Sequence, residues 1–154
     1  MSLDSSFWID APEVTPSDAQ ALLFNTGLFA RLSDTQTRKQ LAADGCIVTI
    51  ALPSAPQFML QDAGISATLH LFFANSDKNE TKAWTWNTMR AVMCLLHAYS
   101  GDALLLYSSG VPAMLRKGGE LILDDRCGLW HPGVEPQVLA MVDLPHRRGV
   151  IPLD

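Results

Sequence analysis

Between Lys82 and Tyr99 the apolar side chains recur at steps of three and four residues. This stripe consists of Trp86, Met89, Val92, Met93, Leu96 and Tyr99. A second set of side chains, mostly polar, falls on the other side, at Lys82, Asn87, Arg90, Cys94 and His97. Because a helix repeats every 3.6 residues, this spacing predicts one amphipathic helix over residues 82–99.

Several short segments outside this helix have the composition of β-strands. They are residues 7–9, 46–52, 67–74, 103–109, 113–116 and 120–123. The 46–52 segment is rich in β-branched side chains, and in the 67–74 segment apolar side chains occupy alternate positions. Glycines between the last three segments favour tight turns, so these three should form an antiparallel meander.

The N-terminal part carries one clear helix start. Thr15 can cap the free amides of a first turn, and Pro16 suits the first helical position. A second, weaker helix is expected near residues 33–41, closed by Asp44 and Gly45, and the alternative is a loop.

Prolines punctuate the chain after Trp130. We therefore expect residues 131–154 to form an extended tail, with one edge strand at 138–142 as an option. Residues 1–154 should form a single domain, since a chain of this length can bury one complete core.

These elements together predict an α+β fold. A mostly antiparallel sheet of about five or six strands should pack against the 82–99 helix, with one or two N-terminal helices beside it. Leu105 and Leu121 are expected in the core.

Composition narrows the range of partners. Eleven Lys and Arg against sixteen Asp and Glu give a net charge of −5, which disfavours nucleic acid and anionic membranes as partners. The N-terminus has no basic segment followed by an apolar run, and no apolar stretch approaches membrane-spanning length. With three widely spaced cysteines and no paired motif, reduced thiols in the cytoplasm are expected.

The sequence carries no motif for catalysis, cofactor binding or metal binding. The four histidines have no ligand spacing, and no cysteine or serine lies in a nucleophile motif. Asp124 and Asp125 are adjacent, so on a strand they would point to opposite faces. Gly118 and Gly119 lie in a hairpin turn rather than at a helix N-terminus. We therefore expect no enzyme activity and no cofactor.

Tryptophan is the residue type that points to a partner. Trp84 and Trp86 stand two positions apart on the predicted helix, so both cannot face the core. An exposed tryptophan is a typical anchor of a protein interface. The alternatives are that Trp84 packs under the tail and that Trp130 caps the core beneath it.

A set of segments resembles the Sit-type immunity proteins of bacterial contact-dependent polymorphic toxin systems. The resemblance covers roughly residues 67–130 and is carried by Thr68-Leu-His-Leu-Phe-Phe, Trp84, Trp86-Asn-Thr-Met, Gly101-Asp-Ala-Leu-Leu-Leu-Tyr, Met114-Leu-Arg, Gly119-Glu-Leu-Ile-Leu and Trp130. It implies a non-catalytic protein that binds and neutralises a cognate toxin.

On this interpretation the toxin would dock on exposed aromatic and acidic side chains. The candidates are Trp84, Asp124, Asp125 and Trp130. Two other functions stay open: a homo-oligomeric structural protein, such as a homodimer, and a small-molecule-binding domain or enzyme whose site is assembled from distant residues.

Overall fold

The computed structural model describes residues 3–54, 57–108, 110–131, 133 and 136–153. Its strands are β1 (Asp4–Ile9), β2 (Ala30–Arg31), β3 (Arg38–Ala43), β4 (Cys46–Ala51), β5 (Leu69–Asn75), β6 (Ala103–Tyr107), β7 (Val111–Lys117), β8 (Glu120–Asp124) and β9 (Arg147–Gly149). The α-helices are α1 (Pro16–Phe24), α2 (Phe58–Ala63), α3 (Thr81–Ala98) and α4 (Pro136–Ala140), and short 3₁₀ helices are η1 (Lys78–Glu80) and η2 (Gly128–Trp130).

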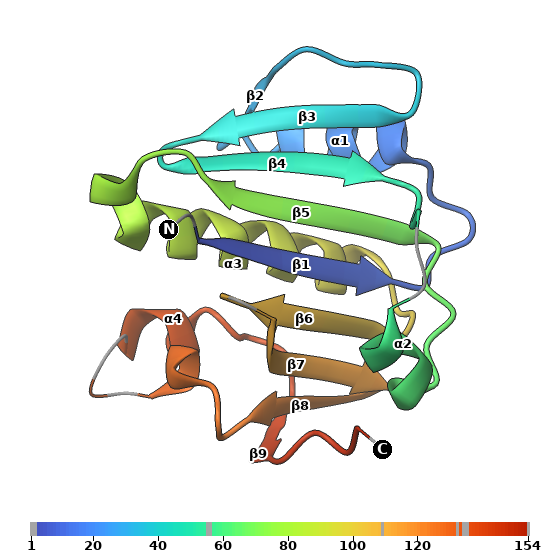
Figure 1. Cartoon of the computed structure of the whole chain (residues 1–154), viewed down its shortest axis with the longest axis vertical. Helices are drawn as coiled ribbons and strands as arrows, with labels where there is room; N and C mark the ends of the chain where they lie inside the picture. Colours follow the sequence, from blue (N-terminus) through green and yellow to red (C-terminus); the bar gives the residue numbers. More distant parts are fainter. Residues whose placement is uncertain (1–2, 55–56, 109, 132, 134–135, 154) are drawn as a thin grey trace.

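All nine strands belong to one sheet with the order β2-β3-β4-β5-β1-β6-β7-β8-β9 (Figure 1). β1 lies in the middle and pairs antiparallel with both β5 and β6. Every pairing is antiparallel except that of β8 with β9. The predicted α+β class and the mostly antiparallel sheet are confirmed. The expected strand number was too low, because β2, β3 and β9 also join the sheet.

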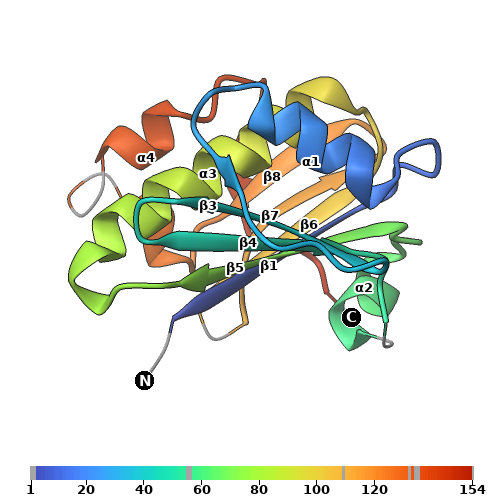
Figure 2. The same cartoon turned by 90° about the horizontal axis from the view of Figure 1, so that it is seen from above.

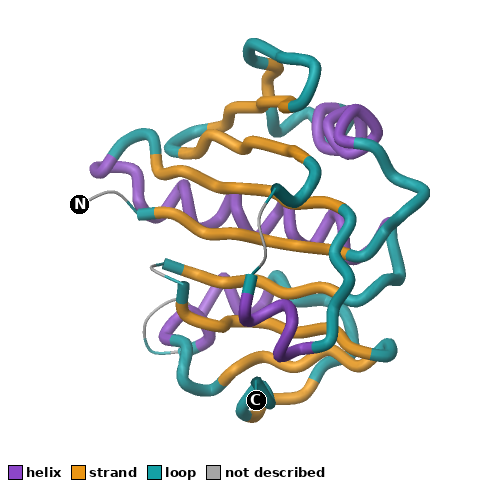
Figure 3. Tube along the Cα trace, turned by 45° about the vertical axis from the view of Figure 1, so that its right-hand side comes forward, coloured by secondary structure: helices purple, strands orange, loops and turns teal. Residues whose placement is uncertain are grey.

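Helices lie on both faces of the sheet. α1, α3 and α4 lie on one side, which we name the inner face, and α2 and the C-terminus lie on the other, the outer face (Figure 2). The long α3 runs behind the middle strands in Figure 3. The larger apolar core lies on the inner face and includes Phe7 and Leu71, together with Leu105 and Leu121, the two residues expected there.

Both predicted helix starts near Thr15 and Lys82 are found. Thr15 and Asp18 form a reciprocal capping box, with side-chain bonds of 3.1 and 3.0 Å to each other's backbone amides. α3 has 18 residues, and its buried side is wider than the predicted stripe. Asn87, expected on the polar side, is buried and donates a 2.8 Å hydrogen bond to the Asp44 carbonyl.

The end of α3 is joined to the sheet by Arg116 of β7. Its buried guanidinium donates to the carbonyl oxygens of Leu96 and Gly101 at 2.8 Å and also to that of Tyr99. These carbonyls have no partner within the helix, so a cation suits them. At Gly101 an added Cβ would lie 1.7 Å from the Asp10 carbonyl oxygen, which leaves room for glycine alone.

The predicted helix or loop over 33–41 is wrong for its second half. Residues 38–43 form β3, which pairs with β4 along its whole length. The turn between them is Asp44-Gly45, with Gly45 at a φ of +68°. Asp-Gly is a typical two-residue hairpin turn, and here it joins strands instead of closing a helix. Pairing with β4 and burial of Leu41 outweigh the weak local helix signal.

The predicted edge strand at 138–142 is also wrong. Val138 is buried within the short helix α4, and the true edge strand is β9, farther along the tail. Ser109 of the predicted 103–109 strand, and residues 132, 134, 135 and 154 of the predicted tail, lie outside the described residues.

The outer face has two halves of different composition. The covered half consists of the outer side chains of β6, β7 and β8 together with Trp8. It packs against α2 and the C-terminal segment. The buried residues of this contact are Leu60, Ile65, Leu104, Leu106, Leu115, Ile122 and Ile151. The open half consists of the outer side chains of β3, β4 and β5, which are only partly buried or exposed: Arg38, Gln40, Ile47, Thr49, Ala51, His70 and Phe72.

Candidate functional site

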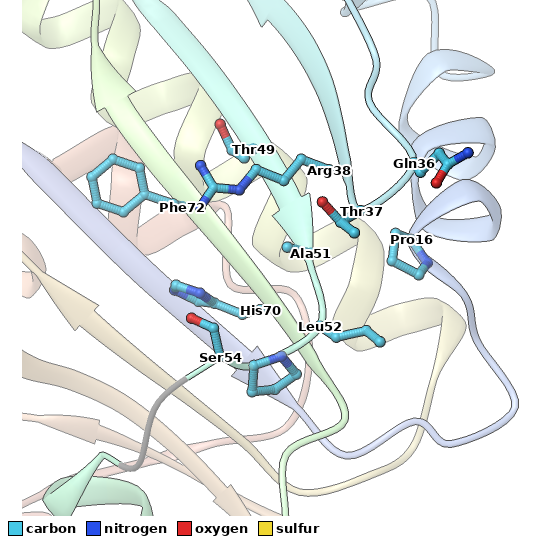
Figure 4. Close-up of a pocket in the computed structure, with 11 residues that line it drawn as sticks. Pro16, Gln36, Thr37, Arg38, Thr49, Ala51, Leu52, Ser54, His70 and Phe72 are labelled. Atoms are coloured by element: carbon cyan, nitrogen blue, oxygen red, sulfur yellow. The ribbon is translucent and has the colours of Figure 1, made fainter.

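A groove of about 710 Å³ lies on the open half (Figure 4). Its floor comes from β4 and β5, and its walls come from the segment before β3, the segment after β4 and the start of α1. The residues that line it are Pro16, Gln36, Thr37, Arg38, Thr49, Ala51, Leu52, Pro53, Ser54, His70 and Phe72. The lining mixes apolar side chains such as Phe72 and Leu52 with the hydroxyl, imidazole and amide groups of Thr49, His70 and Gln36, a composition typical of a binding site.

Strand register explains why these residues meet. Ala51 stands opposite His70, and Thr49 stands opposite Phe72. Arg38 is the cross-strand partner of Ala51 on the other side. Since side chains at directly opposite positions point to the same face, three strands present one continuous surface.

His70 closes the groove toward β1. Its ring stacks on Trp8 with centroids 4.6 Å apart and a 6° angle between the planes, and its Nε2 lies 3.1 Å from Ser6 Oγ. Burial lowers the pKa of His70 to about 4. The ring is therefore neutral at physiological pH. No carboxylate bonds to this ring among the residues that the structure describes, so the Ser6–His70 pair lacks the third group of a catalytic triad.

Arg38 is the one charged side chain among the described residues that line the groove at neutral pH. Figure 4 shows it extending from β3 toward Thr49 and Phe72. Neither an ion pair nor a side-chain hydrogen bond to its guanidinium occurs within the described part of the chain. The groove thus holds a free cation beside an aromatic ring.

A model of the SitI3-like family matches residues 10–133, which is more than half of the chain. The chain belongs to the SitI3-like family. This confirms the resemblance to Sit-type immunity proteins, and the match extends well beyond residues 67–130 to include β3, β4 and most of the groove. Comparison with curated proteins and with solved structures found no match.

Trp84 and Trp130, two of the four residues expected to bind a partner, are buried in the core of this SitI3-like protein. Trp84 is fully buried, donates from Nε1 to the Phe73 carbonyl at 3.3 Å and stacks on Tyr107. Trp130 is fully buried and donates from Nε1 to the Ala113 carbonyl at 2.7 Å. The expectation that they are exposed is therefore wrong: they join α3 and η2 to the sheet. For Trp130 this agrees with the alternative that it belongs to the core.

The two adjacent aspartates, Asp124 and Asp125, differ in burial. Asp124 is fully buried and accepts hydrogen bonds from Arg126 and from the Ile151 amide, so its expected exposure is wrong as well. The Arg126 guanidinium is the main cause that lowers the pKa of Asp124 to about 2. Asp125 is exposed and pairs with Arg148 at 2.9 Å. Both carboxylates hold the C-terminal segment, and neither lies in the groove.

Trp86 is the partly exposed tryptophan of the pair. The two-residue spacing correctly required one exposed ring, but the predicted apolar stripe had placed Trp86, not Trp84, on the buried side. Lys82 and Arg90 lie 5.4 and 5.8 Å from the centroids of its ring system. Trp86 also borders a cavity of about 650 Å³ on the helix side, with Leu28 and Asn87. Two cations lie beside the Trp86 ring and the carboxylate residue Asp44 lines the same cavity, so this surface is of mixed charge and not the acidic aromatic surface that was expected.

The described ranges contain no group of three or more His, Cys, Asp or Glu placed to hold a metal ion. Cys46, Cys94 and Cys127 are free thiols, and burial raises the pKa of Cys46 to about 12. None of the helices described has the length and apolar character needed to cross a bilayer.

The sequence did not reveal the groove, because its residues come from four separated segments. The sequence signal that could have indicated the groove is the set of side chains on β4 and β5 that face outward. Among them Thr49, Ala51 and His70 are smaller or more polar than the residues beside them. His70 stands at one of the positions that alternate with the apolar ones in the 67–74 segment, and it is partly exposed.

Proposed function

We propose that this SitI3-like chain is a non-catalytic immunity protein that neutralises a cognate bacterial protein toxin by binding it across the open half of the outer face. The observation that carries the proposal is the groove: an uncovered stretch of sheet within the region that matches the family. An open sheet face flanked by a covered one gives a partner a rigid surface on which to dock.

The chemistry of the groove supports binding rather than catalysis. General acid–base catalysis requires a group whose pKa lies near the working pH, and the pKa of His70 is about 4. The hydroxyls of Thr37, Thr49 and Ser54 line the same groove as Arg38, without a carboxylate among the described lining residues. Such a set can donate hydrogen bonds to a partner and fix its orientation.

The edge strands of the sheet are short, and this supports docking on the open half of the face and not along an edge. The edge strands β2 and β9 have only two and three residues. Short edge strands present few free backbone groups and resist the addition of another strand. A partner therefore finds more surface on the open half than along either edge.

The test is protection of cells that express the product of the gene adjacent to this one, which is the candidate cognate toxin. Leu52 on the groove and Val150 in the C-terminal segment are both exposed aliphatic side chains, at 62% and 57%. Leu52→Glu introduces a charge at the groove, and Val150→Glu introduces the same charge far from it. We expect Leu52→Glu to lower by about tenfold the toxin dose that cells survive, the change that loss of about 1.4 kcal/mol of binding produces.

Val150→Glu should protect as well as the unmodified chain. Thermal melts of both variants establish that each is folded before the comparison. Equal protection by the two variants would contradict docking on the open half. Absence of any protection by the unmodified chain would contradict the immunity function itself.

A further inference from the structure

We propose that the groove binds an acidic side chain of the toxin, with the guanidinium of Arg38 pairing with an Asp or Glu carboxylate beside Phe72. This inference rests on the proposed function and specifies the chemistry of the docking surface. It also reverses the charge expected for the interface, because the immunity protein here supplies the cation.

Arg38 differs from the other arginines of the chain. Arg116 bonds to backbone carbonyls, and Arg126, Arg147 and Arg148 pair with carboxylates. Arg31 and Arg90 lie over the aromatic rings of Phe24 and Trp86. Within the described residues Arg38 alone among the arginines has neither a carboxylate, a carbonyl nor a ring as partner of its guanidinium. Its partner is therefore expected from outside the chain.

Arg38 is also placed where an incoming carboxylate can be held. The planar guanidinium offers parallel N–H donors that match the two oxygens of a carboxylate. Thr37 and Thr49 line the groove beside it and supply hydroxyl donors. The side chains of Phe72 and Leu52 form the apolar surroundings, in which an ion pair is less screened than in water.

The charge of the whole protein favours a single carboxylate over a polyanion. Nucleic acid and anionic membranes are bound by several cations acting together. The described lining residues provide one cation, and the chain carries a net charge of −5. One acidic side chain presented by a protein surface matches this site, and a row of phosphates does not.

The first experiment tests the groove without the toxin. Benzoate and benzamide have nearly the same shape, and only benzoate carries a carboxylate. Each is titrated into the ¹⁵N-labelled full chain while the amide signals of Thr49, Ala51 and Phe72 are followed. We expect benzoate to shift these signals and benzamide to leave them in place, with the benzoate response lost in Arg38→Gln. Equal responses to the two probes, or no response to benzoate, would overturn the inference.

The second experiment measures affinity for the toxin encoded beside this gene. Arg147→Gln is the matched control, because it removes the same charge from the opposite edge of the sheet, where Arg147 pairs with an exposed Glu120. We expect Arg38→Gln to weaken binding about 10- to 100-fold, the range for a lost hydrogen bond between charged groups. Arg147→Gln should change it less than about twofold.

A scan of Asp→Asn and Glu→Gln substitutions on the toxin identifies the paired residue. One such substitution should weaken binding to the unmodified chain as strongly as Arg38→Gln does, and should add nothing when combined with it. If the toxin binds the unmodified chain and Arg38→Gln equally well, the inference fails while the proposed function stands. If the unmodified chain does not bind the toxin, the proposed function fails, and the carboxylate contact with the toxin fails with it.

Discussion

The outer face of the sheet is one continuous surface, but one half of it is covered by other parts of the chain and the other half is open. A single transverse row of paired residues crosses it from β3 to β9: Arg38, Ala51, His70, Trp8, Leu104, Leu115, Ile122 and Arg147. From Leu104 to Ile122 the row is buried under α2 and the C-terminal segment. From Arg38 to His70 it lines the groove.

Side-chain chemistry, not backbone geometry, separates the two halves. Leu104 and Leu115 bring large apolar areas, and covering them with Leu60 and Ile151 removes that area from water. On the open half Ala51, Thr49 and His70 have less apolar area to bury, and only Ile47 and Phe72 are large apolar side chains. An added chain segment would therefore gain less there than on the covered half.

The largest expected difference between the two halves is the loss of stability when one aliphatic side chain is shortened in each. Leu104 is fully buried, so Leu104→Ala should lower the free energy of unfolding by about 2–5 kcal/mol. Ile47 is only partly buried on the open half, so Ile47→Ala should cost roughly 1 kcal/mol. Urea denaturation of both variants measures the difference. Equal losses would show that the open half is covered in solution.

Acid should destabilise the open half through His70. The pKa of this group is lowered from 6.5 to about 4 in the folded chain, so the unfolded chain binds the proton first as the pH falls. Stability should decline from pH 6.5 to pH 4 by about 3 kcal/mol in total from this residue. His70→Phe keeps an aromatic ring against Trp8 and should lack this decline. A variant with the same pH profile as the unmodified chain would contradict the assignment.

The covered half should respond to stronger acid, through Asp124. Its pKa is lowered from 3.8 to about 2, so its contribution of about 2 kcal/mol is present above pH 4 and is lost as the pH falls toward 2. Asp124→Asn should lower stability at pH 7 by a similar amount and flatten the profile below pH 4. Urea denaturation between pH 7 and pH 2 gives both quantities. A steep profile that persists in Asp124→Asn would point to other carboxylates.

The smallest effect on stability is expected from the groove rim. Arg38 is exposed and Leu52 is 62% exposed, so Arg38→Gln and Leu52→Glu should change the free energy of unfolding by less than about 0.5 kcal/mol. The same variants should impair toxin binding. Large stability losses in either variant would show that these residues support the fold, and would remove the contrast between the two halves.

Much of the fold could be predicted from the sequence because its periodicity is strong. The alternation of Leu69, Leu71 and Phe73 predicted a strand with one buried face, and all three are buried. The segment from Ala103 to Leu106 is apolar at every position, as expected of a strand buried on both faces. By contrast, β3 has one fully buried apolar residue, Leu41, and its identity depends on pairing with β4.

The site was less predictable, for a physical reason. Sequence shows which side chains are suited to an interface, but burial decides which are available. Trp84 and Asp124 have the chemistry of interface residues, and the fold uses that chemistry internally, in hydrogen bonds to the Phe73 carbonyl and to Arg126. Arg38 is also suited to an interface, and it is exposed on the open half, where the pairing of β3 with β4 places it opposite Ala51.

The most direct test of the central claim is the footprint of the toxin on the isotope-labelled chain. Amide signals are compared by NMR between the free protein and the same protein mixed with the candidate toxin of the proposed function. Docking on the open half predicts that the largest changes occur at Thr49, Ala51 and Phe72. Changes concentrated around Trp86 on α3, or along β9, with those three signals unmoved, would contradict it.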